Sequence, residues 1–278
     1  MIICKSIKSI QKCLMDNKLK KKRISFVPTM GSLHQGHLSL VKKAKNENST
    51  VVVSIFINPT QFDPNEDYKN YPRNINKDIR ALKKLSIDFL FIPKKNEILN
   101  HDTSKLNCPK LPVEKIMCGK SRPNYFPGVG NIVIKLFDII KPDIVFFGEK
   151  DYQQYYFIKK IIKKIKFKTK IVLCKTIRDK DGLALSSRNV YLNRKEKYIA
   201  KNIIKILKKT RFELLKNNFS KKILNKNKKL LLKKGINKID YFELRSNDLK
   251  ITFNDRKKIR LFIAVFIGKI RLIDNLKI

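Results

Sequence analysis

The sequence lacks most of the features that mark secreted, membrane and zinc-bound proteins. It has no tryptophan and no CxxC pair, and its five cysteines are irregularly spaced along 278 residues. An odd, scattered set of cysteines indicates neither a disulfide framework nor a structural zinc site. No run of about 18 uncharged apolar residues occurs, which argues against a transmembrane helix. The charged N-terminal stretch also lacks the apolar core of a signal peptide, so we expect a cytoplasmic protein without a membrane partner.

Acidic residues are also scarce. The chain has 64 Lys+Arg against 23 Asp+Glu, a formal net charge of +41. Such an excess is typical of proteins that bind nucleic acid. Here, however, the lysines are spread along the whole chain, without interleaved aromatics and beside heavy use of Ile and Asn. All three residues have A/T-rich codons, so drift in base composition explains the charge. We favour drift and expect no nucleic-acid partner, with nucleic-acid binding as the alternative.

The order of apolar and amphipathic segments predicts the fold class. Short runs rich in Val, Ile and Phe, without strict alternation, are typical of strands covered on both faces. These runs lie at 23–30, 49–58, 87–93, 142–148 and 170–177, with helix-like segments at 37–47, 75–85, 129–140 and 151–165. The alternation predicts an α/β fold with a Rossmann-like, doubly wound parallel sheet. Ligands are then expected at the carboxyl ends of the strands.

The pattern changes near residue 179. Helical spacing at 193–217 and 222–234 is followed by segments typical of antiparallel strands, at 239–245 and 260–275. We therefore predict two domains, a Rossmann-like domain over 1–178 and a smaller C-terminal α+β domain over 179–278.

The segment PTMGSLHQGH, from Pro28 to His37, joins the first predicted strand to the first helix. His34 and His37 are three residues apart, so they share a face on a first helical turn. The free N–H groups and positive dipole at a helix start favour a nucleotide's phosphates. The alternatives are hydrogen-bonded structural histidines or two zinc ligands, but the strand–turn–helix context favours the nucleotide.

A second motif, SIFINPTQF, brings Asn58 and Gln61 to the carboxyl end of the second strand. Amide side chains both donate and accept hydrogen bonds, so they suit hydroxyl and carboxylate groups of a substrate. The alternative is that both residues cap the turn around Pro59.

A third motif, FFGEKDYQQYY, again runs from a strand into a helix. Gly148 has no side chain and therefore leaves space at the end of the strand. Lys150 supplies a compact cation for phosphate. Gln154 follows Lys150 by four residues and shares its face. Glu149 and Asp151 have the alternative of being ordinary acidic residues at a helix start.

A fourth motif, IRDKDGLALSSRN, contains the turn-forming pair Asp181–Gly182. Ser186, Ser187 and Arg188 form a phosphate clamp on a loop able to close over ATP. Capping of a helix by either serine is the alternative.

Together the segments PTMGSLHQGHLSLV, IFINPTQFDPNEDYKNYPR, KLFDIIKPDIVFFGEKDYQQ, DGLALSSRN and RLIDN resemble the pantothenate synthetase family of the HxGH nucleotidyltransferase superfamily. The resemblance is in order and covers nearly the whole chain. It implies a ligase that condenses pantoate with β-alanine through a pantoyl adenylate, releasing AMP and pyrophosphate. It further implies Mg²⁺ with ATP, a homodimer, ATP and pantoate on the N-terminal domain, and a C-terminal lid.

The resemblance also implies residue roles. His37 would be the catalytic histidine, and His34 and Lys150 answer the same need for charge stabilisation on phosphate. Gln61 would contact pantoate and β-alanine, Gln154 would contact pantoate, and Asn58 is a further substrate-binding candidate. The implied ATP site comprises Met30, Gly31, Ser32, Leu33, His34, Gln35, Gly36, His37, Gly148, Glu149, Lys150, Asp151, Ile177, Leu185, Ser186, Ser187 and Arg188. The motifs assign no Mg²⁺ ligands, and Asp78 is only a weak candidate.

The segment RPNYFPGV departs from the family pattern. Asn124 and Tyr125 stand where the family usually has Gly and His, and Asn131 stands where Thr is usual. Tyr does not titrate near neutrality as His does, so handling of β-alanine is expected to be weaker. The rival hypotheses are a tRNA-linked adenylating enzyme, a nucleic-acid-associated protein with a relic pocket, and a decayed synthetase. The short chain has no recognisable anticodon domain, and every phosphate-contacting residue type is present.

Overall fold

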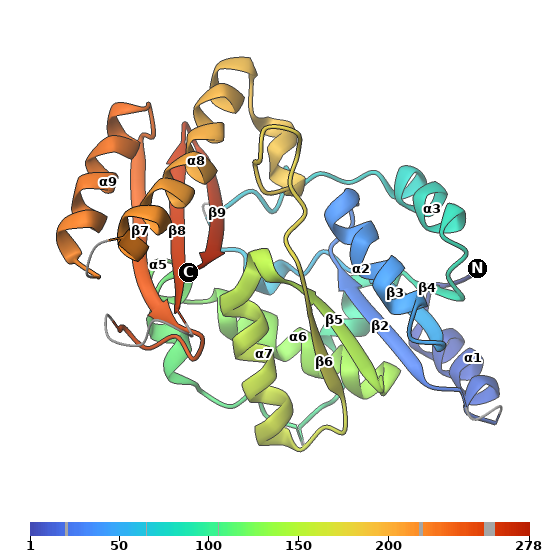
Figure 1. The fold of residues 1–278 in the computed structure, drawn as a ribbon. Coiled ribbons are helices and arrows are strands. Elements are labelled where there is room, and N and C mark those ends of the chain that lie inside the picture. Colours follow the sequence, from blue (N-terminus) through green and yellow to red (C-terminus); the bar gives the residue numbers. More distant parts are fainter. Residues whose placement is uncertain (20–21, 65, 105, 217–218, 253–258) are drawn as a thin grey trace. The chain divides into compact units, whose positions relative to one another are not determined.

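The computed structural model describes residues 1–19, 22–64, 66–104, 106–216, 219–252 and 259–278 (Figure 1). The chain forms two compact units. Unit 1 comprises Met1–Gly148 and Gln154–Lys175, and unit 2 comprises Glu149–Gln153 and Thr176–Ile278.

Unit 1 is built on a six-stranded sheet in which each pairing is parallel. Its strands are β1 (Ile2–Cys4), β2 (Ile24–Thr29), β3 (Thr50–Ile55), β4 (Phe89–Phe91), β5 (Ile144–Gly148) and β6 (Lys170–Cys174). They lie in the order β1-β4-β3-β2-β5-β6. The chain winds outward from β2 to β3 on one side, and later from β5 on the other. The switch in direction between β2 and β5 is where open α/β sheets place ligands.

Helices cover both faces of this sheet, because successive side chains of a strand point to opposite faces. Val27 of β2 packs in one cluster with Leu40 and Val41, whereas the Phe26 ring meets the edge of Phe137 at 6.3 Å. The helices of unit 1 are α1 (Ile7–Leu19), α2 (Gln35–Lys45), α3 (Ile75–Lys84), α4 (Lys95–Leu99), α5 (Cys118–Ser121), α6 (Tyr125–Ile140) and most of α7 (Tyr152–Ile165), with 3₁₀ turns η1 (Pro59–Gln61) and η2 (Pro112–Lys115). The predicted doubly wound parallel sheet is confirmed.

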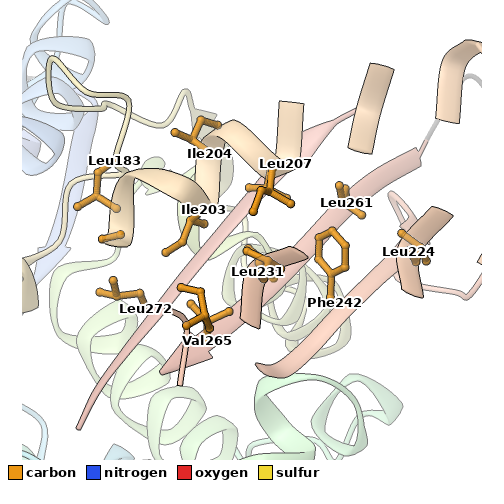
Figure 2. Close-up of a cluster of buried hydrophobic side chains, with 14 of the residues drawn as sticks. Leu183, Ile203, Ile204, Leu207, Leu224, Leu231, Phe242, Leu261, Val265 and Leu272 are labelled. Atoms are coloured by element: carbon orange, nitrogen blue, oxygen red, sulfur yellow. The ribbon is translucent and has the colours of Figure 1, made fainter. Parts of the chain in front are cut away.

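Unit 2 is a smaller unit of helices and antiparallel strands, which agrees with the α+β part of the predicted fold class. It contains η3 (Glu149–Asp151), η4 (Ser187–Tyr191), α8 (Arg194–Lys216), α9 (Lys221–Lys233) and the antiparallel strands β7 (Lys238–Ser246), β8 (Ile259–Ile267) and β9 (Ile270–Lys277). Figure 2 shows its core, where Leu207 of α8 and Leu231 of α9 pack with Phe242 and Val265 of the sheet. None of the described helices combines the length and apolar character needed to cross a membrane.

Candidate active site

The turn that follows β2 has a sharp backbone conformation. Gly31 has φ +76 and Ser32 has φ 50, and a Cβ on Gly31 would lie 3.0 Å from Ile55 Cγ2. The buried carboxylate of Asp78, on α3, accepts hydrogen bonds at 2.8 Å from the backbone N–H groups of both Ser32 and Leu33. Burial raises the pKa of Asp78, and these two backbone donors oppose the rise. The weak metal-ligand candidate therefore holds the turn, a role that local sequence did not suggest.

The two histidines of this turn contact each other at the start of α2. His34 is the N-cap residue, and its Nδ1 accepts from the backbone N–H of Gly36 at 3.1 Å. The Nδ1 of His37 lies 3.4 Å from the backbone N–H of His34, and the ring centroids are 4.1 Å apart. A backbone N–H can only donate, so both Nδ1 atoms are acceptors and each neutral ring carries its proton on Nε2. The helix start thus holds both rings through Nδ1, and a helix N-terminus is a common place for phosphate oxygens to bind.

Asn58 is buried and its hydrogen bonds lie within the protein. Its Oδ1 accepts from the backbone N–H and hydroxyl of Thr60 at 3.0 and 2.8 Å. Its Nδ2 donates to the Gly128 carbonyl at 3.0 Å and to Gln61 Oε1 at 3.1 Å. The turn-capping interpretation therefore describes Asn58, and its contact with substrate stays a prediction. Gln61 Nε2 in turn donates to Met30 Sδ at 2.9 Å, which brings the second motif to the first.

A second polar group lies at the start of α6. The Tyr125 hydroxyl donates to Gln154 Oε1 at 2.7 Å. Arg122 forms a two-point ion pair with Glu66 at 2.5 and 2.6 Å and donates to the Gln61 carbonyl at 3.1 Å. Sequence reasoning noted Tyr125 only as a departure from the family and missed both Arg122 and Glu66. The Arg-Pro pair just before Asn124 was the only local signal.

In unit 2 the turn Glu149–Asp151 is tied to the strands. Asn275 Nδ2 donates to the carbonyls of Glu149 and Lys150 at 2.8 and 3.0 Å. Arg260 pairs with the Glu149 carboxylate at 2.8 Å, so Glu149 is an ion-pair partner. Lys150 Nζ lies 3.1 Å from Asp151 Oδ1.

The loop over 177–189 is shaped by the same terminal strand. Gly182 has φ +87 and its N–H donates to the Asp179 carbonyl at 3.0 Å, so the predicted turn is present. Arg178 forms a two-point ion pair with Asp274 at 2.6 and 2.9 Å. Burial raises the pKa of Asp274, and Arg178 opposes the rise. Two polar residues of the RLIDN motif thus hold two separate segments. Asn275 holds the turn at 149–151, and Asp274 holds the loop at 177–189.

Within this loop the predicted ATP residues adjoin one another. The Leu185 N–H donates to the Ile177 carbonyl at 3.0 Å. Ser186 caps η4, since its Oγ accepts from the Arg188 N–H at 3.3 Å. The capping alternative for this serine is therefore observed, while its contact with phosphate stays a prediction.

The predicted site residues fall into two sets. Unit 1 holds 30–37, Asn58, Gln61, Gly148 and Gln154, and unit 2 holds 149–151, Ile177 and 185–188. In the described part of the chain, no group of three or more His, Cys, Asp or Glu could cage a metal ion. Mg²⁺ commonly binds through substrate phosphates and one or two carboxylates, so such a cage is not required for it.

Comparison with known proteins adds a family assignment. The sequence profile described as pantoate–β-alanine ligase matches residues 2–277. A pantothenate synthetase of Buchnera aphidicola is 45% identical over an alignment of 285 positions, which covers 100% of this chain and 99% of the relative. The crystal structure of pantothenate synthetase from Thermus thermophilus superposes with a TM-score of 0.93 at 33% identity, covering 100% and 99% of the two chains. Pantoate–β-alanine ligase from Francisella tularensis, complexed with β,γ-ATP and β-alanine, gives a TM-score of 0.82 at 41% identity, covering 100% and 97%.

Proposed function

The chain belongs to the pantoate–β-alanine ligase family, and on that basis we propose that it condenses pantoate with β-alanine in an ATP-dependent reaction. The structural observation that carries the proposal is the histidine pair at the start of α2, with ring centroids 4.1 Å apart, on the same turn as Met30, to which Gln61 Nε2 donates. A relative with bound β,γ-ATP and β-alanine supports both ligands for this site.

In the first step a pantoate carboxylate oxygen attacks the α-phosphorus of ATP, and the bond from that phosphorus to pyrophosphate breaks. Negative charge grows on the phosphate oxygens, so preorganised donors and cations lower the barrier. His37, His34 and Lys150 supply these, and the ATP-binding residues of 30–37, 148–151, Ile177 and 185–188 complete the nucleotide site. Mg²⁺ neutralises phosphate charge when bound with ATP.

In the second step the β-alanine amine attacks the acyl carbon of the adenylate, AMP leaves and the amine loses a proton. The mixed anhydride is already activated, so this step requires no Ser or Cys nucleophile. Gln61 binds pantoate and β-alanine, Gln154 binds pantoate, and Asn58 holds Gln61.

The remaining assignments are also part of the proposal. Residues 1–178 bind ATP and pantoate, residues 179–278 act as a lid, and the enzyme works as a cytoplasmic homodimer. These assignments rest on the resemblance to the family.

The deciding experiment measures AMP and pantothenate from ATP, D-pantoate and Mg²⁺, with and without β-alanine. We expect both products only when every component is present. Pyrophosphate without pantothenate would place a defect in the amine step and contradict the full reaction. Absence of both products would overturn the proposed function.

A further inference from the structure

Tyr125 contacts both Gln154, a predicted substrate residue, and Arg122, which itself donates to the carbonyl of Gln61. Its hydroxyl donates to Gln154 Oε1 at 2.7 Å, and the Arg122 guanidinium lies 4.0 Å from its ring centroid. We propose that Tyr125 is a positioning residue that turns the Gln154 amide so that its NH₂ end faces the substrate. The inference rests on the proposed function and extends it to this chain's departure from the family pattern.

The phenol is suited to donate rather than accept this hydrogen bond. Its oxygen lone pairs are partly delocalised into the ring, and the cation above the ring face draws electron density from it. Both effects strengthen the O–H donor and weaken the acceptor. Oε1 of Gln154 therefore points to Tyr125, and Nε2 takes the opposite side of the amide.

The ring itself is held on several sides. Arg122 is fixed by its two-point pair with Glu66 and by the Gln61 carbonyl. The edge of Tyr125 packs on Phe126 with ring centroids 5.0 Å apart. A ring fixed in this way loses little further entropy when it orients its neighbour.

The amide of Gln61 is also oriented by a donor that holds its Oε1, but here the donor is Asn58. The Thr60 backbone N–H must donate, so it fixes Oδ1 of Asn58, and the Gly128 carbonyl must accept, so it fixes Nδ2. Asn58 Nδ2 then donates to Gln61 Oε1, which leaves Gln61 Nε2 directed at Met30. Each of the two glutamines thus has its Oε1 held by a donor, which turns its NH₂ end away from that donor. Such a pair favours ligands with carboxylate or hydroxyl oxygens and disfavours ligands that place a cationic amine there.

The test is a double-mutant cycle on pantoate and ATP kinetics with Tyr125→Phe, Gln154→Ala and the double variant. Phe keeps the ring beneath Arg122 and removes only the hydroxyl. We expect Tyr125→Phe to raise KM for pantoate about five- to tenfold, the scale of one neutral hydrogen bond, with KM for ATP unchanged. In the Gln154→Ala background the same substitution should add less than about twofold.

Tyr156→Phe is the matched control, since Tyr156 lies on the same helix as Gln154 and its ring faces Lys160 at 5.1 Å. An unchanged KM for pantoate in Tyr125→Phe, or an equal rise in both backgrounds, would overturn the inference. If the wild-type enzyme makes no pantothenate, the function fails separately. The Gln154 side-chain ¹⁵N–H₂ resonances then decide: a shift on Tyr125→Phe supports the positioning contact, and unchanged resonances refute it.

Discussion

His34 and His37 each hold the start of α2 and are also the histidines proposed to act on the nucleotide. Each ring uses Nδ1 to accept a backbone N–H and keeps Nε2 as a donor. The structural alternative weighed from sequence and the nucleotide interpretation are therefore compatible, because they use opposite nitrogens of the ring.

His37→Ala removes one of these donors, and we expect it to lower the rate of adenylate formation by about 10²-fold or more. A pyrophosphate-release assay measures this step alone. The chain has three histidines, and the third, His101, pairs with Asp138 at 2.8 Å. His101→Ala is thus the control and should retain nearly full activity. A near-normal rate in His37→Ala would remove the catalytic role.

Gly148 allows binding to be separated from folding. A Cβ built there meets no atom of the described protein within 4 Å, so Gly148→Ala should unfold at nearly the wild-type temperature. If ATP approaches the backbone at this strand end, the added methyl should raise KM for ATP about tenfold or more. An unchanged KM for ATP would remove Gly148 from the nucleotide site.

Gly128→Ala is the contrasting variant. Its Cβ would lie 2.1 Å from the Thr60 carbonyl oxygen, so the start of α6 must move away from η1. We expect a clear loss of thermal stability here, which thermal melts of both glycine variants would report side by side.

Two cysteines should be slow to react in the folded protein. Burial, with a contribution from Cys13, raises the pKa of Cys4 to about 11, and burial raises the pKa of Cys108 to about 11. At a pH of about 8, native-state alkylation should be about a hundredfold slower than for an ordinary thiol. The raised pKa values also mean that these groups favour the folded state below about pH 9 and lose this effect as the pH rises toward about 11.

Mass spectrometry after timed iodoacetamide treatment gives the rates at each thiol, and the urea-unfolded chain is the control. Native-state alkylation of Cys4 or Cys108 at the rate of glutathione would contradict the expected protection.

Among the elements, the last strand, β9, contacts residues that lie far from it in the sequence. Asn275 of β9 ties the turn that contains Lys150, although 125 residues separate them. Asn275→Ala should leave two partly buried carbonyls without this donor and lower the free energy of unfolding by about 1–3 kcal/mol. It should also lower kcat, because the Lys150 turn is loosened.

Lys277→Ala, an exposed position on the same strand, is the matched control and should change neither quantity. Urea unfolding and steady-state kinetics measure both effects. Full stability with full activity in Asn275→Ala would show that β9 does not position this turn.

The regular elements were largely predictable from sequence because their signals are local. The β2, β3, β5 and β6 strands and the α8 and α9 helices lie within a few residues of the predicted segments. The β1 strand was missed since its three residues are too short for a periodic pattern, and its pairing of Ile2 with Phe89 is set by tertiary structure.

The candidate site was predictable only in part, because some of its contacts are local in the sequence and others are not. The HxGH turn and the SSR loop are contiguous, so their chemistry shows in the sequence. The partners that shape them are distant: Asp78 holds Ser32 across 46 residues, and Asp274 holds Arg178 across 96. A polar residue in a buried strand, such as Asn275, indicates that it makes a hydrogen bond inside the protein, but the sequence does not show with which residue.

The amphipathic helices of unit 2 show where part of the positive charge of the molecule lies. The α8 and α9 helices bury apolar side chains such as Leu207 and Leu231 in the unit 2 core, while Lys208, Lys229 and Lys233 stand on exposed positions. These three lysines thus lie on the solvated faces of the two helices. This arrangement agrees with compositional drift, and the family assignment makes a tRNA-linked enzyme the weaker rival.

Such a surface should attract polyanions without selecting among them. In filter binding at about 50 mM salt we expect similar affinities for unrelated RNAs, duplex DNA and heparin, because all offer the same charge. Raising salt to about 200 mM should weaken each by about 10³-fold or more, since the binding free energy comes from counterion release. Ligase activity should change far less over the same range, because ATP and pantoate bind in sites with directed hydrogen bonds. One RNA that keeps its affinity at the higher salt while the others lose it would contradict drift. That result would assign the basic faces of α8 and α9 to a selected nucleic-acid partner.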